Sequence, residues 1–243
     1  MEDKIYGRNP VIEALSGDRE IDKIFFQDGL THSLISKITA MAKEKRIPYK
    51  FVNRKKLDEL ADGGNHQGVV AFVAMQSYAT VEDILDRAKE KGEPPFILIA
   101  DGLSDPHNLG SIIRTANAAG MHGIIIPKNR SVSLNAVVAK VSAGAIEHIP
   151  VAKVANIAQT IEKLKKEGVW VAGTDLSASG YHYDADLKGP LAIVIGSEGE
   201  GIGRLVKEKC DFLVKIPMIG EIESLNASVA AGVLIYEAIR QRS

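Results

Sequence analysis

Short apolar runs alternate with helix-spaced apolar positions along the second half of the chain. Runs rich in Ile, Val and Leu predict buried strands, and apolar residues three and four positions apart predict helices. The predicted strands cover 96–100, 123–127, 149–151, 169–174, 191–195 and 212–216, and the predicted helices cover 110–119, 134–143, 155–167, 205–209 and 224–240. Regular alternation of this kind predicts an α/β fold, with a mostly parallel sheet and helices on both faces.

Residues 1–76 carry their own, shorter set of alternating elements. Strands are predicted at 23–27, 49–52 and 69–74, and helices at 9–15, 33–45 and 54–61. A capping-box pattern at Thr80 then predicts a charged helix, which Gly92 and two prolines end. We therefore predict a small α/β domain over 1–76, a linker over 77–95 and a larger domain over 96–243.

The composition excludes several classes of protein. The 243 residues are 45% hydrophobic, as in globular domains, and the formal net charge of −1 gives no overall attraction to nucleic acid. The single cysteine, Cys210, excludes an internal disulfide and a multi-cysteine metal site, and we expect it to be a buried structural thiol. No apolar run reaches the ~20 residues that span a bilayer. We therefore predict a cytoplasmic protein with no membrane partner.

Three polar, glycine-rich segments follow predicted strands. Parallel strands end at one edge of a sheet, and open α/β sheets bind ligands there, so the three segments outline a site. In the first segment Asn108 and Gly110 precede a helix, and Arg114 lies about one turn further in. The second contains Glu198, and in the third Ser224 is a candidate N-cap of the last helix. Taken alone, each segment is also explained as an ordinary turn or cap.

Common catalytic and cofactor motifs are missing from the sequence. The glycines of the second segment lack G-x-G-x-x-G spacing and follow a late strand, which argues against a dinucleotide-binding oxidoreductase. Neither an H-E-x-x-H pair nor a G-x-S-x-G elbow occurs, so we predict neither a zinc hydrolase nor a serine hydrolase. We predict no metal site.

The same three segments resemble a known set of motifs. Asp105-Pro-x-Asn-x-Gly-x-x-x-Arg114, Ile195-Gly-Ser-Glu-Gly199, and Ile216-Pro-Met followed by Ser224-Leu-Asn-Ala-Ser228 are similar, in this order, to motifs of the SpoU (TrmH-like) RNA 2′-O-methyltransferases. The resemblance covers residues 96–243. It implies a domain whose carboxyl-terminal part is threaded into a trefoil knot, with S-adenosyl-L-methionine bound at the crossing.

The resemblance also implies which residues act. The catalytic set is Arg114, Asn108, Glu198, Ser224 and Asn226, and the cofactor-binding set is Gly196, Ile216, Leu225, Thr174, Gly173 and Met218. A guanidinium stays protonated in proteins, so Arg114 suits phosphate binding and stabilisation of negative charge better than removal of a proton. The other four catalytic residues would position the ribose and Arg114.

The amino-terminal unit extends the resemblance. Tyr6-Gly-Arg-Asn-Pro-Val-Ile-Glu-Ala-Leu15 and His66-Gln-Gly-Val-Val70 resemble the L30e-like substrate-binding domain of bacterial 23S rRNA guanosine 2′-O-methyltransferases. One stretch of this unit holds a single acid, Glu44, and seven basic residues, Lys43, Lys45, Arg46, Lys50, Arg54, Lys55 and Lys56. Such a local excess in a chain with little net charge predicts an RNA contact.

Together these features predict a homodimeric enzyme that methylates the ribose 2′-hydroxyl of a guanosine in 23S rRNA, near the peptidyl-transferase centre. The final helix is apolar on nearly every face, which favours a dimer, and the resemblance also implies one. Methylation of tRNA guanosine, or of another rRNA nucleotide, stays open. A non-catalytic RNA-binding assembly factor would fit a degraded motif set, but all five residues of the implied catalytic set are present.

Overall fold

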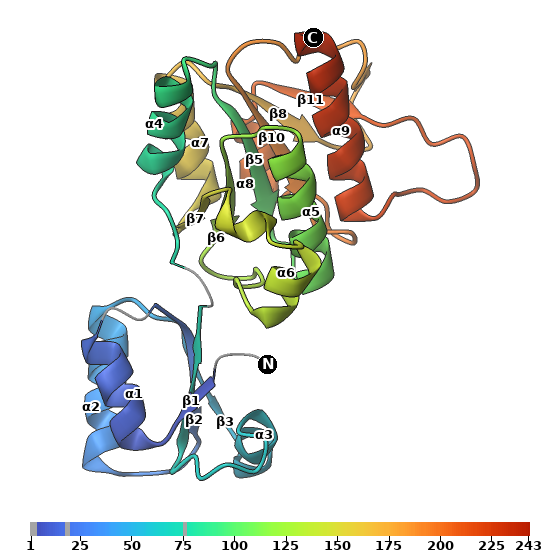
Figure 1. Ribbon diagram of the computed structural model, residues 1–243. Coiled ribbons are helices and arrows are strands. Elements are labelled where there is room, and N and C mark those ends of the chain that lie inside the picture. The colour runs from blue at the N-terminus through green and yellow to red at the C-terminus, as the bar shows by residue number, and fades with distance from the viewer. Residues whose placement is uncertain (1–3, 18–19, 75–76) are drawn as a thin grey trace. The chain divides into compact units, whose positions relative to one another are not determined.

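The computed structural model describes residues 4–17, 20–74 and 77–243, which separate into two compact units. The first unit comprises 1–77 with 133–137, and the second comprises 78–132 with 138–243. Each unit is an α/β structure with its own sheet and its own core (Figure 1). The predicted α/β class, with a mostly parallel sheet in the larger unit, is confirmed.

The first unit is built on a four-stranded sheet. Its elements are β1 (Lys4–Tyr6), α1 (Arg8–Ser16), β2 (Ile21–Gln27), α2 (Ser33–Glu44), β3 (Tyr49–Val52), α3 (Arg54–Leu60) and β4 (Val69–Val73). The strand order is β1-β4-β2-β3, and only β2 and β3 pair in parallel. α1 and α2 share a core with Ile24 and Phe26, and α3 contributes Leu57 to a separate, smaller core. The sequence pattern does not predict β1, because three residues are too few to show alternation.

The two amino-terminal motifs meet in this unit. The backbone N–H of Arg8 donates to Gln67 Oε1 (3.3 Å), and its Nε–H donates to the Gln67 carbonyl (2.9 Å). His66 accepts from the N–H of Gly68 at Nδ1 (2.9 Å), and its Nε2 lies 2.9 Å from Asp58 Oδ1. Because Nδ1 accepts, a neutral ring carries its proton on Nε2 and donates it to Asp58. The Arg8 bonds fasten the turn before β4 to the start of α1, and the His66–Asp58 contact fastens it to α3.

The second unit has a seven-stranded sheet in the order β7-β6-β5-β10-β8-β11-β9, in which every neighbouring pair is parallel. Its strands are β5 (Phe96–Asp101), β6 (Gly123–Pro127), β7 (Val151–Val154), β8 (Trp170–Thr174), β9 (Gly180–Tyr181), β10 (Leu191–Gly196) and β11 (Phe212–Lys215). Its helices are α4 (Val81–Lys91), α5 (Pro106–Ala118), α6 (Ala136–Val141), a 3-10 turn (Ala145–Glu147), α7 (Ile157–Lys166), α8 (Arg204–Lys209) and α9 (Ala227–Arg242).

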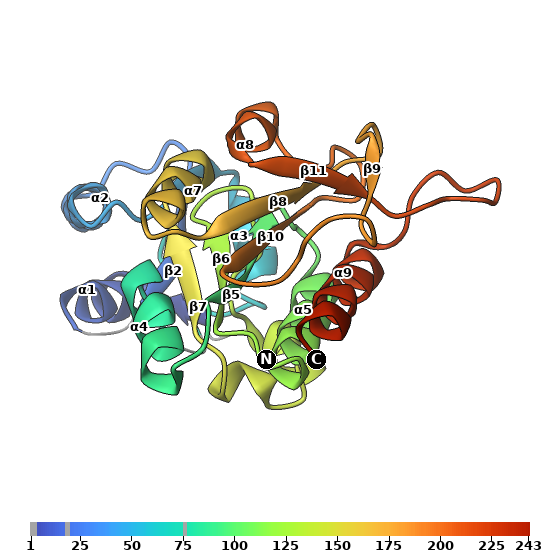
Figure 2. The same cartoon turned by 90° about the horizontal axis from the view of Figure 1, so that it is seen from above.

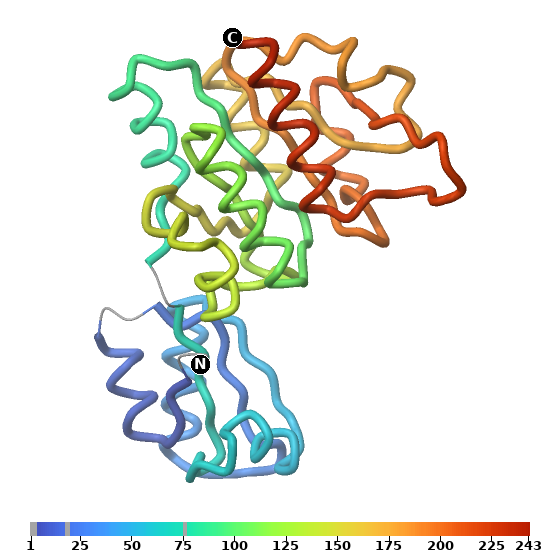
Figure 3. Tube along the Cα trace, turned by 45° about the vertical axis from the view of Figure 1, so that its right-hand side comes forward, coloured from blue at the N-terminus to red at the C-terminus, as the bar shows by residue number. Residues whose placement is uncertain are grey.

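Helices cover both faces of this sheet. On one face α4, α7 and α8 contribute Ile84, Ile161 and Val206 to a core shared with Ile99 and Val194. α5 and α9 lie side by side on the opposite face, where α9 also contacts β10 (Figures 2 and 3). Among the described residues, no helix is both long enough and apolar enough to cross a membrane.

The segment predicted as a linker, 77–95, contributes a helix to the core of the second unit. Thr80 caps α4 as the sequence predicts, because its Oγ1 accepts from Asp83 N (3.1 Å) and Asp83 Oδ2 accepts from Thr80 N (2.7 Å). α4 then buries Val81, Ile84 and Leu85 in that core. Although α4 is rich in charged residues, its apolar side chains recur at helical spacing and form one face, which packs on the sheet.

α5 begins one turn earlier than predicted. Asp105 is its N-cap and accepts from the backbone N–H of His107 at Oδ1 (2.9 Å), and Pro106 takes the first helical position. Proline suits that position, because the first N–H of a helix has no partner within the helix. Asn108 and Gly110 therefore lie inside the helix and not before it.

α9 begins later than predicted. Its N-cap is Asn226, whose Oδ1 accepts from the N–H groups of Ser228 (3.0 Å) and Val229 (3.3 Å). Ser224, predicted as the cap, lies exposed in the loop before the helix. That loop extends away from the sheet between β11 and α9 and exposes the side chain of Ile219 almost completely (Figure 1).

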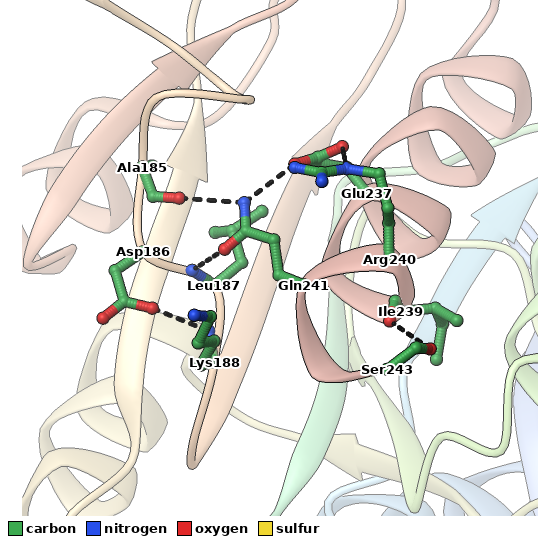
Figure 4. A network of polar contacts seen from close by, with 9 residues as sticks. All are labelled: Ala185, Asp186, Leu187, Lys188, Glu237, Ile239, Arg240, Gln241 and Ser243. Atoms are coloured by element: carbon green, nitrogen blue, oxygen red, sulfur yellow. Dashed lines mark hydrogen bonds and ion pairs between the residues drawn. The ribbon is translucent and has the colours of Figure 1, made fainter.

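The carboxyl-terminal end of α9 holds the segment between β9 and β10. Gln241 donates from Nε2 to the carbonyl of Ala185 (3.0 Å), and its Oε1 accepts from Leu187 N (2.9 Å) (Figure 4). Hydrogen bonds from Arg240 and Gln241 lower the pKa of Glu237 to about 2. Side chains of α9 therefore satisfy backbone groups of a segment that has no neighbouring strand at these positions.

Candidate active site

A cavity of about 350 Å³ opens where strands of the parallel sheet end. β8, β10 and β11 are neighbours and parallel, so the segments that follow them meet at one edge of the sheet. The cavity is lined by residues 174–177 at the end of β8, by residues 195–201 at the end of β10, by six residues at and after β11, and by the first turn of α9. The six are Val214, Lys215, Ile216, Met218, Ser224 and Leu225. Such an edge is where open α/β sheets bind their ligands.

A cluster of three polar side chains lies beside the cavity. Asn108 on α5 donates from Nδ2 to Glu198 Oε1 (3.0 Å). Asn226 at the start of α9 donates from Nδ2 to both Asn108 Oδ1 (2.9 Å) and Glu198 Oε1 (2.5 Å). The N–H of Ala227 also points to Glu198 Oε1 (3.4 Å). The structure therefore joins all three segments that the sequence analysis selected, and Asn108 is buried at their centre.

One wall of the cavity is made of backbone. The N–H of Ser197 donates to the Gly201 carbonyl (3.2 Å), and the N–H of Gly201 donates back to the Ser197 carbonyl (2.9 Å). This tight turn folds over the end of β10, so that a Cβ placed on Gly196 would lie 2.0 Å from the carbonyl carbon of Gly201. Only glycine fits at 196. The N–H of Gly203 further anchors the turn on Asp101 Oδ2 (2.9 Å), at the end of β5.

The wall after β8 carries a charged pair. Asp175 accepts from Lys207 Nζ (2.6 Å) and from the backbone N–H of Ser177 (2.8 Å), and the Ser177 hydroxyl also contacts it. Partial burial raises the pKa of Asp175, but the hydrogen bonds from Lys207 and Ser177 outweigh burial and hold the pKa below its ordinary value. The cavity therefore has an ionised carboxylate in this wall at neutral pH.

Most of the residues assigned to the site by resemblance line the cavity. These are Thr174, Gly196, Glu198, Ile216, Met218, Ser224 and Leu225. Gly173 does not line it, because successive residues of a strand point to opposite faces. A Cβ at Gly173 would lie 2.8 Å from both Cys210 Sγ and Leu213 Cδ2, so this glycine permits close packing beside α8.

Two residues of the first segment, Arg114 and Gly110, do not line the cavity. Arg114 is exposed on α5, and its side chain forms no hydrogen bond or ion pair with any residue that the structure describes. Its guanidinium is therefore available to a ligand. A Cβ at Gly110 would lie 2.7 Å from Cβ of Val141, so Gly110 allows α5 and α6 to approach closely.

Sequence reasoning missed the wall formed by Asp175, Ser177 and Lys207. A signal was present, because Asp175 directly follows a predicted strand, as the three selected segments do. That segment has no glycine cluster, and Lys207 lies far from it in the sequence. The pairing across this distance depends on the order of β8 and β11 in the sheet.

The described residues provide neither a metal site nor a reactive cysteine. In the described ranges, which omit 1–3, 18–19 and 75–76, no three His, Cys, Asp or Glu side chains lie close enough to hold a metal ion. Cys210 is half-buried and not fully buried as predicted, and it packs on the core that α7 and α8 cover. Partial burial, aided by Asp211, raises the pKa of its thiol to about 11. The thiol is therefore protonated at neutral pH, as a structural cysteine is.

Solved structures share this fold. The SpoU methyltransferase AviRb of Streptomyces viridochromogenes, in complex with the cofactor AdoMet, has a TM-score of 0.63 and 25% identity, over 99% of this chain and 90% of that chain. The AdoMet-bound rRNA methyltransferase of Sinorhizobium meliloti has a TM-score of 0.60 and 27% identity, over 98% of this chain and 86% of that chain. The fold and the site thus define an RNA methyltransferase that depends on S-adenosyl-L-methionine.

Sequence relatives identify the family. Residues 95–236 match the SpoU rRNA Methylase family, and residues 4–79 match the domain described as RNA 2'-O ribose methyltransferase substrate binding. The chain is 54% identical over 241 residues to a Bacillus subtilis (strain 168) protein named as the TrmH family tRNA/rRNA methyltransferase YacO, covering 99% of this chain and 96% of YacO. A Staphylococcus aureus (strain MSSA476) protein named as a TrmH family tRNA/rRNA methyltransferase is 50% identical over 243 residues, 100% and 98% of the two chains. The chain belongs to the SpoU rRNA Methylase family and is an RNA 2′-O-methyltransferase of the TrmH/SpoU type.

Proposed function

We propose that this enzyme methylates the ribose 2′-hydroxyl of a guanosine in 23S rRNA, near the peptidyl-transferase centre. The observation that carries the chemistry is the contact of Asn108, Glu198 and Asn226 beside a cavity at the carboxyl ends of the strands. The substrate-binding domain and its exposed basic residues support a large folded RNA as the substrate. A target ribose needs an accessible nucleotide, so a loop of folded rRNA fits better than regular duplex.

The cavity suits S-adenosyl-L-methionine in size and in chemistry. Its volume of about 350 Å³ lies within the ordinary range of cofactor pockets. Ile216, Met218 and Leu225 offer apolar contacts for an adenine ring, and Asp175 and Glu198 supply negative charge near a cationic ligand. When bound, the cofactor supplies a methyl group activated by its sulfonium charge.

The proposed contacts divide between backbone and side chains. Gly196, Ile216 and Leu225 would hold the cofactor largely through backbone groups, with Thr174 and Met218 nearby. Gly173 would act only indirectly, by letting β8 pack closely on Cys210 and Leu213.

The polar cluster and Arg114 would act on the ribose. Glu198 already accepts bonds from Asn108 and Asn226, so the three side chains form a fixed group against which a ribose can be oriented, with Ser224 at its margin. Arg114 stays protonated, and its planar guanidinium would bind the flanking phosphate and stabilise negative charge developing on the 2′-oxygen.

Methylation of tRNA is the second candidate. The A. aeolicus TrmH/SpoU tRNA modifying enzyme is 30% identical, with a TM-score of 0.55, but it covers 66% of this chain. The Sinorhizobium meliloti rRNA methyltransferase covers 98%. The larger shared length, which extends over the substrate-binding domain, supports rRNA.

We also propose a two-fold symmetric homodimer formed through α9. One face of this helix buries Ala231, Leu234 and Ala238, and another exposes Val229 and Tyr236 to about half of their area, at 50% and 52%. Exposed apolar side chains at helical spacing form a stripe that a second subunit would cover. The trefoil knot that the resemblance implies stays a prediction, as does the cytoplasmic location.

Labelled S-adenosyl-L-methionine provides the test of the substrate. The purified enzyme is incubated with 23S rRNA, 16S rRNA and tRNA from cells that lack the gene, and the RNA is digested to nucleosides. We expect label on 2′-O-methylguanosine from 23S rRNA alone. Preferential labelling of tRNA would replace the proposed substrate with the second candidate.

A further inference from the structure

The edge strand of the first unit combines an exposed aromatic ring with unpaired cations. β3 is the outermost strand of the order β1-β4-β2-β3. Phe51 on this strand is 48% exposed, although it is one of the larger apolar side chains. The outer side of an edge strand has no neighbouring strand, so a ring exposed there is accessible to another molecule.

Phe51 is held in place by the core beneath it. Its ring stacks on Phe26, with centroids 5.4 Å apart and planes inclined by 30°, and Phe26 is fully buried. Tyr49 meets the same ring edge-on at 6.0 Å. One face of Phe51 is therefore supported by the protein, and its exposed area is available to a flat partner. A nucleic acid base stacks on a ring presented in this way.

Cations stand at both ends of this strand. Lys43, Lys45 and Arg46 end α2 just before it, and Lys50 and Lys55 lie on β3 and at the start of α3, all of them exposed. None of these five has an ion-pair partner among the residues that the structure describes, whereas Arg54 and Lys56 are paired within α3. The four residues of β3 span roughly 13 Å at the usual rise per residue. Side chains alternate along a strand, so Lys50 points to the face opposite Phe51, as its pairing with Phe25 shows. The cations therefore flank the ring on both faces of this edge, where they are available to phosphates of a strand that follows the edge.

Arg46 occupies a position where glycine is the ordinary choice. Its backbone φ is 53°, in the left-handed region. Its N–H donates to the Lys43 carbonyl (3.0 Å), and Ile47 N donates to the Ala42 carbonyl (2.8 Å), which is the Schellman ending of a helix. A side chain at this position is disfavoured relative to glycine. An arginine there keeps a cation at the beginning of the edge strand in spite of its backbone conformation.

We propose that β3 and the end of α2 form a binding platform for single-stranded RNA, with Phe51 stacking on a base and Arg46, Lys50 and Lys55 holding the flanking phosphates. The proposal rests on the proposed RNA substrate and identifies the surface and the strand state that the first unit recognises. Duplex RNA keeps its bases stacked within the helix, so it offers phosphates but no free base to Phe51.

Fluorescence anisotropy with the full chain tests the platform. The probes are a labelled single-stranded RNA of roughly 12 nucleotides, within the site sizes of such platforms, and a blunt-ended RNA duplex of the same length. Phe51→Leu keeps apolar bulk on Phe26 but removes the ring. We expect it to weaken single-strand binding about tenfold, within the range for loss of one stacked base, and to leave duplex binding and the salt dependence unchanged. Trp170→Leu, at a residue that is 60% exposed in the second unit, is the matched control and should leave both affinities unchanged.

The cations are tested separately through salt. The double variant Lys50→Gln, Lys55→Gln should reduce the slope of log affinity against log salt by about 1.4 for the single strand, from two lost phosphate contacts. Native single-strand binding by Phe51→Leu, equal losses for single strand and duplex, or an unchanged slope in the double variant would each overturn the platform. Native binding by Phe51→Leu would instead assign this edge to an apolar contact with a protein.

The two proposals fail separately. If 23S rRNA is methylated while Phe51→Leu binds RNA as the native chain does, the platform is wrong and the substrate stands. If the protein methylates no 23S rRNA while single-strand binding still depends on Phe51, the substrate is wrong and the platform stands.

Discussion

The Nδ2 of Asn226 donates to the Oδ1 of Asn108 at 2.9 Å and so joins two residues 118 positions apart in the sequence. The same side chain caps α9 through its Oδ1 and donates to Glu198. A single amide therefore starts the last helix and fixes it to α5 and to the turn after β10. Helix capping and site geometry depend on different atoms of this side chain, which allows them to be separated by substitution.

Asn226→Ser should retain the fold and lose the chemistry. Serine caps helices about as well as asparagine, so we expect the free energy of unfolding to change by less than ~0.5 kcal/mol. It cannot donate to Asn108 and Glu198 together, so methyl transfer should fall by about 100-fold, the usual scale for a lost positioning contact. Asn226→Ala should lose the activity and also about 1 kcal/mol of stability. Equal activity of the serine variant and the native enzyme, measured at saturating cofactor, would remove the cluster from the mechanism.

Arg114→Ala should abolish turnover without weakening cofactor binding. Arg114 is exposed and does not line the cavity, so its loss should leave both the melting temperature and the S-adenosyl-L-methionine affinity unchanged. Methyl transfer should fall by about 1,000-fold or more, because a charged donor to the developing oxyanion is removed. Arg114→Lys should also be poor, since an ammonium does not reproduce the planar fork of a guanidinium. Near-native turnover by either variant, in an assay with calorimetric titration of the cofactor alongside, would exclude the proposed role.

Fragments of the second unit should depend on α4. A fragment 78–243 keeps Val81, Ile84 and Leu85 on the sheet, and we expect it to fold and to bind cofactor. A fragment that starts near Glu93 lacks these side chains and should be destabilised by several kcal/mol, at roughly 1.5–3 kcal/mol for each large buried side chain. The longer fragment should bind RNA more weakly than the full chain at matched salt. Equal RNA affinities would argue that the first unit does not bind the substrate.

The thiol of Cys210 should resist alkylation in the folded protein. Burial raises its pKa to about 11. The rate with iodoacetamide should therefore rise about tenfold for each pH unit above 8, whereas the unfolded chain should react as an ordinary thiol. Because the folded pKa lies above the unfolded value, this group contributes stability below pH 9, and the contribution is lost as the pH rises toward 11. Rapid alkylation at pH 8 without unfolding would contradict the raised pKa of this thiol.

Tyr236→Glu should convert the proposed dimer into monomers. The side chain is 52% exposed on α9, so the monomer tolerates a carboxylate there, but an apolar interface would not. Leu205→Glu on α8, at a residue that is 58% exposed on the other face of the sheet, is the control and should remain dimeric. Sedimentation equilibrium at micromolar concentration measures both. A monomeric native protein with full activity would refute the dimer.

The parallel sheet and its helices follow from the sequence because each element is long enough to show its period. The strands 96–100 and 191–195 and the helix 155–167 have continuous or evenly spaced apolar residues, and the structure has β5, β10 and α7 there. β9, with two residues, shows no pattern of its own. It exists because it pairs with β11, and strand pairing is not visible in a local window.

The site was predictable where its residues belong to segments with a recognisable local pattern. Asn108, Glu198 and Asn226 belong to segments that stand out by glycine content and position after a strand. The choice of Asn226 over Ser224 as the cap of α9 depends on contacts with distant residues, and so does the pairing of Asp175 with Lys207. Gly173 and Gly110 allow close packing against Cys210 and Val141. Because these neighbours are distant in the sequence, the sequence alone does not show that the glycines serve packing and not ligand contact.

The turn over Gly196 means that one part of the cavity lining tolerates substitution less than the rest. Every side chain at 196 would meet the backbone of Gly201, so substitution there destroys the turn before it can alter what the cavity accepts. Another part of the lining, Ile216, Met218, Ser224 and Leu225, belongs to the loop between β11 and α9. Residues 219–224 of this loop are exposed and therefore pack little against the rest of the protein. New ligand preferences in relatives of this enzyme should therefore arise by changes on the loop side, while the glycine turn stays the same.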